Sequence, residues 1–198
     1  MISQRIGEGA QFLLRGIIRF LIFLRVKPNH LTMAGFIMSI VVAYIFAMGE
    51  FRLAGAALIV AGLFDMVDGM VARKLGKVTE FGAFFDSIMD RYSDLIVYLG
   101  LVIYYGHAER INYVVLVGIV MMGSVLTSYA RARAESLIPK CKVGFLERPE
   151  RIVLLLIGSF YFMDPVIWVF AILSNWTVVH RFLYTRAVIQ GKKGLVNP

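Results

Sequence analysis

The sequence predicts an all-α integral membrane protein, in which six transmembrane helices follow an N-terminal amphipathic helix that lies in the membrane interface. Two observations carry this prediction. The 198 residues are 59% hydrophobic and their mean hydropathy is +0.75, whereas soluble domains are about 45–50% apolar. The apolar residues also form long blocks, several of which reach the roughly 20 residues that a helix needs to cross a bilayer. No linker interrupts them, so residues 1–198 are expected to form a single domain.

Residues 1–27 are predicted to form the amphipathic helix that precedes the membrane spans. Polar residues recur there at intervals of three to four positions, which places them on one stripe of a helix built otherwise of Phe, Leu and Ile. The stripe consists of Gln4, Glu8, Gln11, Arg15 and Arg19. These polar residues interrupt the apolar run, so the segment does not resemble a signal peptide.

Residues 28–198 are predicted to form a bundle of six membrane-spanning helices. Their expected bounds are Leu31–Met48, Leu53–Lys74, Gly82–Tyr105, Ile111–Arg131, Arg151–Phe162 and Pro165–Tyr184. Short turn signals separate consecutive spans, such as Gly49-Glu50 after the first and Asp164-Pro165 before the last. The fifth span is short, and Pro149 favours an earlier start because proline suits the first turn of a helix.

The charged residues predict how the chain lies in the membrane. The net charge is +8, but the basic residues lie between apolar blocks rather than on one soluble face, which argues against a nucleic-acid-binding protein. With the N-terminus in the cytoplasm, 19 of the 21 Lys and Arg residues fall on the cytoplasmic side, and only Arg52 and Arg110 fall on the other. The positive-inside rule therefore predicts a protein of the cell membrane with both termini and the active site facing the cytoplasm.

The second and third spans contain five aspartates, which are Asp65, Asp68, Asp86, Asp90 and Asp94. Each would cost about 2.5–3.5 kcal/mol near the centre of a bilayer, so they must face a polar cavity, a partner charge or a metal. Asp65 and Asp68 are three residues apart, and Asp86 and Asp90 are four apart, so each pair shares one helix face. Antiparallel packing then brings four carboxylates together, and such hard oxygen ligands suit Mg²⁺ or Mn²⁺.

Small residues and an arginine stand at fixed offsets from these carboxylates. Together they make eight signature positions over 26 residues, namely Asp65, Asp68, Gly69, Ala72, Arg73, Gly82, Asp86 and Asp90. These positions resemble the complete signature of the CDP-alcohol phosphatidyltransferase family. The wider plan, an interfacial helix followed by six membrane helices, also resembles that family. The resemblance implies a homodimeric membrane transferase of phospholipid biosynthesis that uses Mg²⁺ or Mn²⁺, with two ions expected.

The resemblance also implies a role for each signature residue. The metal ions would be held by Asp65, Asp68, Asp86 and Asp90, and Asp90 would also be the catalytic base. The CDP-activated donor would bind at Asp68, Gly69, Ala72, Arg73 and Gly82. Asn29 and Thr32 belong to a Pro-Asn-His-Leu-Thr segment that resembles the family's start of the first span, where they either cap the helix or help to bind the donor.

The second substrate is expected to bind through arginines that lie near the ends of the last three spans. The expected ligands of an acceptor phosphate are Arg131, Arg133, Arg148, Arg151 and Arg186. Arginine suits phosphate because its planar guanidinium donates two hydrogen bonds at once. The alternative for these arginines is positive-inside topology with attraction to anionic lipid. The Ala-Arg-Ala-Glu and Glu-Arg-Pro-Glu-Arg segments resemble the branch of the family whose acceptor is inositol phosphate.

The resemblance thus implies transfer of a phosphatidyl-type group from CDP-diacylglycerol, or its archaeal equivalent, to inositol 1-phosphate with release of CMP. Two alternatives keep the same chemistry, with glycerol 3-phosphate as acceptor or with CDP-inositol as donor to inositol phosphate. An alternative of a different class is a membrane cation transporter, since buried aspartates also mark ion paths. A transporter does not explain the fixed offsets of Gly69, Ala72, Arg73 and Gly82 from the aspartates.

Overall fold

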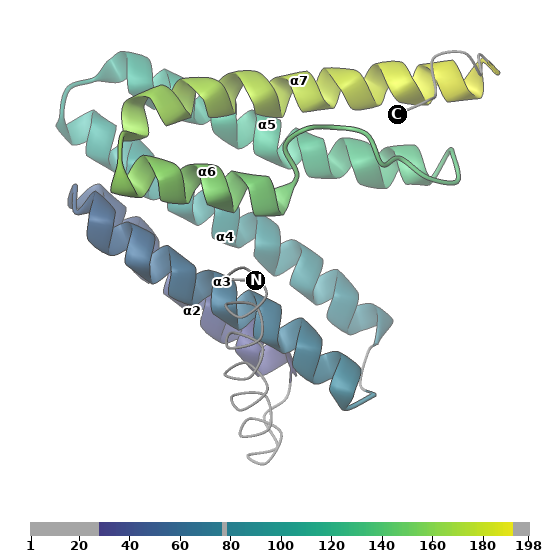
Figure 1. The fold of residues 1–198 in the computed structure, drawn as a ribbon, viewed down its shortest axis with the longest axis horizontal. Coiled ribbons are helices and arrows are strands. Elements are labelled where there is room, and N and C mark those ends of the chain that lie inside the picture. Colours follow the sequence, from purple (N-terminus) through teal and green to yellow (C-terminus); the bar gives the residue numbers. More distant parts are fainter. Residues whose placement is uncertain (1–27, 77–78, 192–198) are drawn as a thin grey trace, which may run out of the picture.

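The computed structural model describes residues 28–76 and 79–191, and within these ranges it contains six α-helices and no strand (Figure 1). The helices are α2 (Pro28–Ala47), α3 (Phe51–Lys74), α4 (Glu80–His107), α5 (Ile111–Glu135), α6 (Arg148–Phe160) and α7 (Met163–Ile189). Each of the six predicted spans corresponds to one helix, with ends that differ by up to five residues. The amphipathic helix predicted for residues 1–27 lies outside the described residues.

Four of the six helices are long and apolar enough to cross a membrane, namely α2, α3, α5 and α7. The 28 residues of α4 are long enough as well, but the helix carries several charges in its first half. The 13 residues of α6 extend only about 20 Å at 1.5 Å per residue, less than the roughly 30 Å of a bilayer core. The prediction of six full spans is therefore confirmed only as far as an all-helical bundle in which four helices are long and apolar enough to cross a membrane.

The helices form two groups that are joined through α4 and α6 (Figure 1). In one group α2 packs against α3 and α4, and in the other α5 packs against α7. Close approach requires glycine at two of these contacts. A Cβ on Gly100 of α4 would collide with the backbone of Ala43 on α2, and a Cβ on Gly123 of α5 would collide with Ser174 on α7. Small residues at such contacts are typical of membrane helix packing.

The apolar core occupies one end of the bundle, on one side of the aspartates. It is built from buried side chains of all six helices, including Phe46, Leu58, Leu101, Val117, Leu155 and Ile167. The ring of Tyr98 packs edge to face against Phe170 at 5.5 Å, which joins α4 to α7. This core fixes the first part of α3 and the second part of α4. The carboxylates extend from the opposite parts of the same two helices.

A cluster of polar side chains around Asp164 stabilises the core end of the bundle. Asp164, at the start of α7, accepts a hydrogen bond of 2.7 Å from the Tyr105 hydroxyl and forms an ion pair of 2.7 Å with Arg110. The guanidinium of Arg110 also lies over the ring of Tyr113, 4.0 Å from its centroid. These contacts join the α4–α5 loop to the start of α7, at the end of the bundle away from the aspartates of α3 and α4.

Candidate active site

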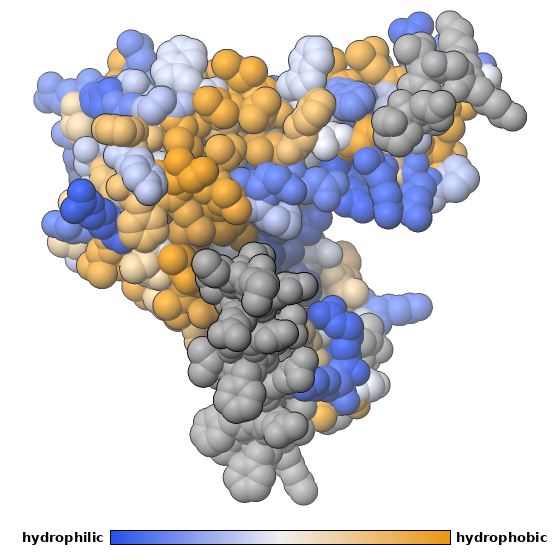
Figure 2. Space-filling model, viewed as in Figure 1, coloured by the Kyte–Doolittle hydropathy of each residue, from blue (hydrophilic) through white to orange (hydrophobic). Residues whose placement is uncertain are grey.

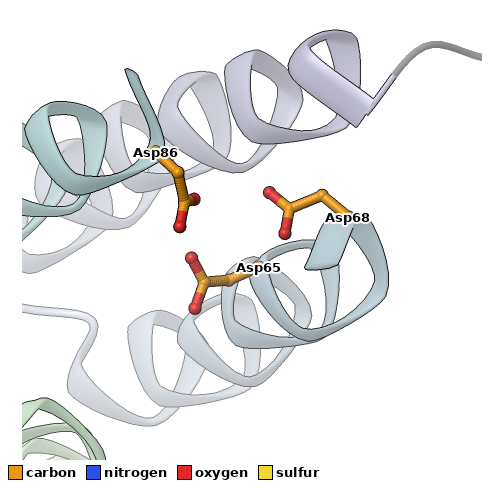
Figure 3. Close-up of side chains that lie close together, drawn as sticks. All are labelled: Asp65, Asp68 and Asp86. Carbon is orange, nitrogen blue, oxygen red and sulfur yellow. The ribbon is translucent and has the colours of Figure 1, made fainter. Parts of the chain in front are cut away.

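Three carboxylates from two helices converge at the centre of the site. Asp65 and Asp68 extend from α3 and Asp86 from α4, and one oxygen of each lies within 4.8 Å of the others. Figure 3 shows the three side chains pointing into one shared space. The spacing of three residues on α3 produces this arrangement because it places Asp65 and Asp68 on one helix face.

The oxygen atoms of this trio suit a divalent cation. Asp86 Oδ1 is buried and has no hydrogen-bond partner among the described residues, so it is free to bind a ligand. Three anions this close repel one another unless a cation lies between them. Hard carboxylate oxygens are the ligands that Mg²⁺ and Mn²⁺ prefer. The residues present therefore fit the metal that the sequence predicts.

Helix α2 contributes a residue that fixes one of these carboxylates. The hydroxyl of Thr32 donates a hydrogen bond of 2.7 Å to Asp68 Oδ2, and the Asp68 side chain is buried. Thr32 thus contacts a metal-site carboxylate directly. From the sequence, this threonine was expected either to cap the helix or to help bind the donor. Its hydrogen bond to Asp68 is an additional contact that was not predicted.

Asp90 lies one turn beyond Asp86 on α4, beside the trio rather than within it. Its Oδ1 is 2.9 Å from Arg148 Nη1, and the same nitrogen is 2.6 Å from Asp65 Oδ2. Arg148 at the start of α6 therefore bridges the metal-site carboxylates and Asp90. The expectation that Asp90 is a further metal ligand stays a prediction.

A pocket of about 260 Å³ opens on one side of the trio, between the start of α2, the end of α3 and the start of α4. All seven residues predicted to contact the donor line this pocket: Asn29, Thr32, Asp68, Gly69, Ala72, Arg73 and Gly82. We call it the signature pocket. A Cβ on Gly82 would come within 2.9 Å of Thr79 Oγ1, so a larger residue would crowd the pocket wall.

Thr79 is a residue of this pocket that the sequence reasoning missed. Its side chain accepts a hydrogen bond of 3.0 Å from the backbone N–H of Gly82 and thereby caps the N-terminus of α4. A threonine immediately before a helix is a known N-cap signal, so the position was identifiable. The cap fixes the first turn of α4, from which Gly82 and Asp86 both extend.

A second pocket of about 410 Å³ lies on the other side of Asp90 and is lined by five arginines. They are Arg91 of α4, Arg131 of α5, Arg148 and Arg151 of α6, and Arg181 of α7. We call it the basic pocket. Asp90 also lines it, whereas Asp65, Asp68 and Asp86 do not. In the space-filling view, hydrophilic residues gather along the lower edge of the C-terminal part of α5 and the α5–α6 segment, where the surface is hollowed above the lower helices (Figure 1 and Figure 2).

The structure divides the five arginines predicted to bind an acceptor phosphate. Arg131, Arg148 and Arg151 line the basic pocket, but Arg133 and Arg186 line a separate, more apolar pocket between α5 and α7. Helix geometry explains the division, since Arg131 and Arg133 project about 160° apart on α5. On α7, Arg181 lines both pockets, so Arg181, which was not among the five, lies in the basic pocket where Arg186 was expected.

Buried contacts hold the arginines of the basic pocket in place. Arg181, 2% exposed, donates hydrogen bonds to the carbonyls of Val143 at 2.8 Å and Thr127 at 2.7 Å. Glu147 accepts from Arg181 at 2.8 Å and from Arg131 at 3.0 Å. The carbonyl and carboxylate partners offset the burial of these charges. They fix the orientation of these guanidiniums in a pocket wall that also contains the carboxylates of Asp90, Asp94, Glu135 and Glu147.

Comparison with known proteins identifies related sequences along most of the chain. The model of the CDP-alcohol phosphatidyltransferase family matches residues 25–184. The archaetidylinositol phosphate synthase of Methanothermobacter thermautotrophicus is 37% identical over 164 residues, which cover 79% of this chain and 81% of that protein. The phosphatidylinositol phosphate synthase of Mycobacterium tuberculosis is 34% identical over 177 residues, covering 83% of this chain and 82% of the relative.

Two solved structures of the Mycobacterium tuberculosis phosphatidylinositol phosphate synthase share this fold. The structure with CDP-DAG bound has a TM-score of 0.80 and 32% identity, and the match covers 87% of this chain and 92% of that one. The structure in complex with manganese and citrate has a TM-score of 0.76 and 30% identity, with 93% and 92% covered. The family match includes all eight signature positions and the basic-pocket arginines.

Proposed function

Because this chain belongs to the CDP-alcohol phosphatidyltransferase family, we propose that it transfers a phosphatidyl-type group from a CDP-activated lipid to inositol 1-phosphate and releases CMP. One observation carries the proposal. Asp68 and Asp86 of the trio line the signature pocket, and Asp90, one helical turn beyond Asp86, lines the basic pocket. This order supports an arrangement in which the donor and the phosphorylated acceptor would approach the carboxylates from two sides.

The signature pocket suits the nucleotide end of the donor. Gly69, Ala72 and Gly82 have no large side chain and therefore leave room for the nucleotide, and Arg73 supplies a positive charge for phosphate. Binding of CDP-DAG by the structurally similar Mycobacterium tuberculosis enzyme supports a CDP-lipid as donor here. CDP-diacylglycerol and its archaeal equivalent carry the same cytidine diphosphate, so the pocket chemistry applies to both.

Asp65, Asp68 and Asp86 would hold Mg²⁺ or Mn²⁺, with two ions proposed, and the manganese in a structurally similar protein supports this assignment. Bound metal would stabilise the negative charge of the diphosphate during transfer. The chain's own contribution is to hold three carboxylates within reach of one point and to orient Asp68 through Thr32. Orientation by a hydrogen-bonded neighbour is a common way to tune a metal ligand.

Asp90 is proposed as the base that takes the proton of the acceptor hydroxyl. The hydroxyl oxygen then forms a bond to the phosphorus next to the donor lipid, the bond between that phosphorus and the CMP oxygen breaks, and CMP leaves. The proton stays on the Asp90 carboxyl group. Arg148, 2.9 Å from Asp90 Oδ1, holds this carboxylate at the boundary of the basic pocket.

The basic pocket is proposed to bind the acceptor phosphate. Five arginines line this cavity against four carboxylates, and their guanidiniums favour a dianion over an uncharged acceptor such as serine or inositol. The names of the relatives support inositol phosphate, since they make phosphatidylinositol phosphate or archaetidylinositol phosphate. Homodimer formation is proposed from the family resemblance alone.

The proposal is tested by offering the purified protein CDP-diacylglycerol with Mg²⁺ or Mn²⁺ and one of four acceptors: inositol 1-phosphate, glycerol 3-phosphate, inositol or serine. We expect CMP release with inositol 1-phosphate, no release after chelation of the metal, and little release with the two unphosphorylated acceptors. CMP release with glycerol 3-phosphate but not with inositol 1-phosphate would overturn the acceptor. Absence of CMP with every acceptor and either metal would overturn the transferase proposal itself.

A further inference from the structure

Asp94 is the aspartate of α4 that lies outside both the eight signature positions and the metal-site trio. It follows Asp90 by four residues, so the two carboxylates lie on one helix face, a turn apart. Its side chain is only 13% exposed. A carboxylate buried in a membrane helix needs partner charges. Asp94 has two of them, Arg148 and Arg151, and both arginines line the basic pocket.

Arg151 is held on two sides. Its Nη2 lies 3.0 Å from Asp94 Oδ2, while its Nη1 donates a hydrogen bond of 2.9 Å to the carbonyl of Ser124 and also contacts the Ser124 hydroxyl. The arginine side chain is 5% exposed. With α4 on one side and α5 on the other, the guanidinium has a single orientation. Asp94 is the carboxylate in this set of contacts, so it supplies the negative charge that Arg151 requires.

Arg148 is drawn toward the metal site by two other carboxylates. Its Nη1 lies 2.6 Å from Asp65 and 2.9 Å from Asp90, whereas its Nε lies 3.7 Å from Asp94 Oδ1. The two oxygens of Asp94 therefore face different arginines, Oδ1 toward Arg148 and Oδ2 toward Arg151. Two guanidiniums beside one cavity repel each other, and a carboxylate between them reduces that repulsion.

We propose that Asp94 is a positioning residue that holds Arg148 and Arg151 at a fixed separation, so that both guanidiniums bind the acceptor phosphate together. The proposal rests on the proposed function, because it takes the basic pocket as the acceptor-phosphate site. Asp94 lines the basic pocket itself, but its carboxylate would repel a phosphate, so it is not proposed as a phosphate ligand. Its effect on the acceptor passes through the two arginines that it contacts.

The test compares Asp94→Asn with Asp164→Asn, two substitutions that remove one charge and keep the side-chain shape. Asp164 is a matched control because its carboxylate also binds an arginine, at the core end of the bundle. For Asp94→Asn we expect the acceptor KM to rise about tenfold, which corresponds to about 1.4 kcal/mol. The KM for CDP-diacylglycerol and the Mn²⁺ dissociation constant should change less than twofold. Asp164→Asn should leave all three constants unchanged.

An unchanged acceptor KM in Asp94→Asn would overturn the proposal. So would an equal rise in the acceptor KM, the donor KM and the Mn²⁺ constant, because a general structural role predicts a uniform loss. If Asp94→Asn fails to fold, Asp94→Glu serves the same comparison, since it keeps the charge but displaces it by one methylene. In that variant too, a selective acceptor defect supports the proposal and a uniform or absent defect overturns it.

A binding measurement separates this proposal from the proposed function. If the wild-type protein releases no CMP with any acceptor, the proposed function fails, but inorganic phosphate still reports on the basic pocket. Calorimetric titration of phosphate into the metal-free protein should then show weaker binding in Asp94→Asn than in the wild type and Asp164→Asn. Equal binding in all three proteins, or no binding in any of them, would overturn the role of Asp94.

Discussion

Thr32 donates a hydrogen bond of 2.7 Å to Asp68, a residue 36 positions later in the sequence. The bond links the first turns of α2 to the metal-site face of α3. It uses one lone pair of Asp68 Oδ2 and restricts the rotation of the carboxylate that converges with Asp65 and Asp86. The first described helix thus contributes to the metal site through an uncharged residue.

Thr32→Val should weaken Mn²⁺ binding by about tenfold or more, the range seen when the hydrogen-bonding partner of a metal ligand is removed. Valine keeps the shape of threonine but cannot donate to Asp68. Electron paramagnetic resonance titration of Mn²⁺ measures the affinity directly. Thr32→Ser, which keeps the hydroxyl, is the control and should bind Mn²⁺ almost as the wild type does. Equal affinities in the valine and serine variants would show that the hydrogen bond does not influence the metal.

Asp90→Asn should lower kcat by about 10²–10⁴-fold, the contribution typical of a general base. Asparagine matches aspartate in shape but cannot accept the proton of the acceptor hydroxyl. Because Asp90 lies outside the signature pocket, binding of CDP-diacylglycerol should remain close to the wild-type value. CMP release measures turnover, and equilibrium binding of labelled donor measures the second quantity. Turnover near the wild-type rate would remove Asp90 from the chemical step.

Gly82→Ala should raise the KM for the CDP-lipid donor. The new Cβ would come within 2.9 Å of Thr79 Oγ1 and would narrow the signature pocket at the start of α4. The acceptor KM should change little, because the basic pocket contains neither residue. Gly118→Ala is the control, since a Cβ at that position of α5 meets no atom within 4 Å. A donor KM unchanged from the control would mean that the pocket tolerates a methyl group at residue 82.

The orientation in the membrane is testable by cysteine labelling. Cys141 is buried and is first replaced by alanine. Single cysteines are then introduced at exposed Ala108, in the α4–α5 loop, and at exposed Lys140, between α5 and α6. The charge distribution predicts that a membrane-impermeant maleimide applied to intact cells labels Ala108→Cys but not Lys140→Cys. The reverse pattern would place the active site on the outer side.

The sequence predicted that Asp65, Asp68 and Asp86 converge because short-range helix geometry determines much of their arrangement, whereas Asp90, expected in the same group, lies beside it. Asp65 and Asp68 share a face whatever surrounds α3, and a short connection to α4 limits where Asp86 can lie. The Thr32 contact was beyond such reasoning, because it depends on how α2 crosses α3. That crossing is set by packing between helices, which no periodicity within a single helix specifies.

Arg131 and Arg133 were predicted to line one acceptor site because they lie close together along the chain. In the structure their side chains point in different directions and line different pockets. Arg131 and Arg133 belong to one short segment but project about 160° apart on α5. The same periodicity that paired the aspartates would have separated these arginines, so this part of the site was predictable in principle. Which face of α5 meets the basic pocket still required the packing of α5 against α7.

The separation leads to a paired prediction for Arg131→Gln and Arg133→Gln. Arg131 lines the basic pocket and forms an ion pair with Glu147, so its loss should raise the KM for inositol 1-phosphate by about tenfold, or about 1.4 kcal/mol. Arg133 faces the apolar pocket between α5 and α7, where its Nη1 lies 3.3 Å from the Ser136 hydroxyl, and its loss should leave that KM within twofold of the wild-type value.

Both variants remove one positive charge from the same turn of α5, so a long-range electrostatic effect would raise the two KM values equally. Steady-state CMP release at varied acceptor concentration distinguishes the outcomes, and an equal rise would mean that net charge, rather than direct contact in the basic pocket, governs acceptor binding.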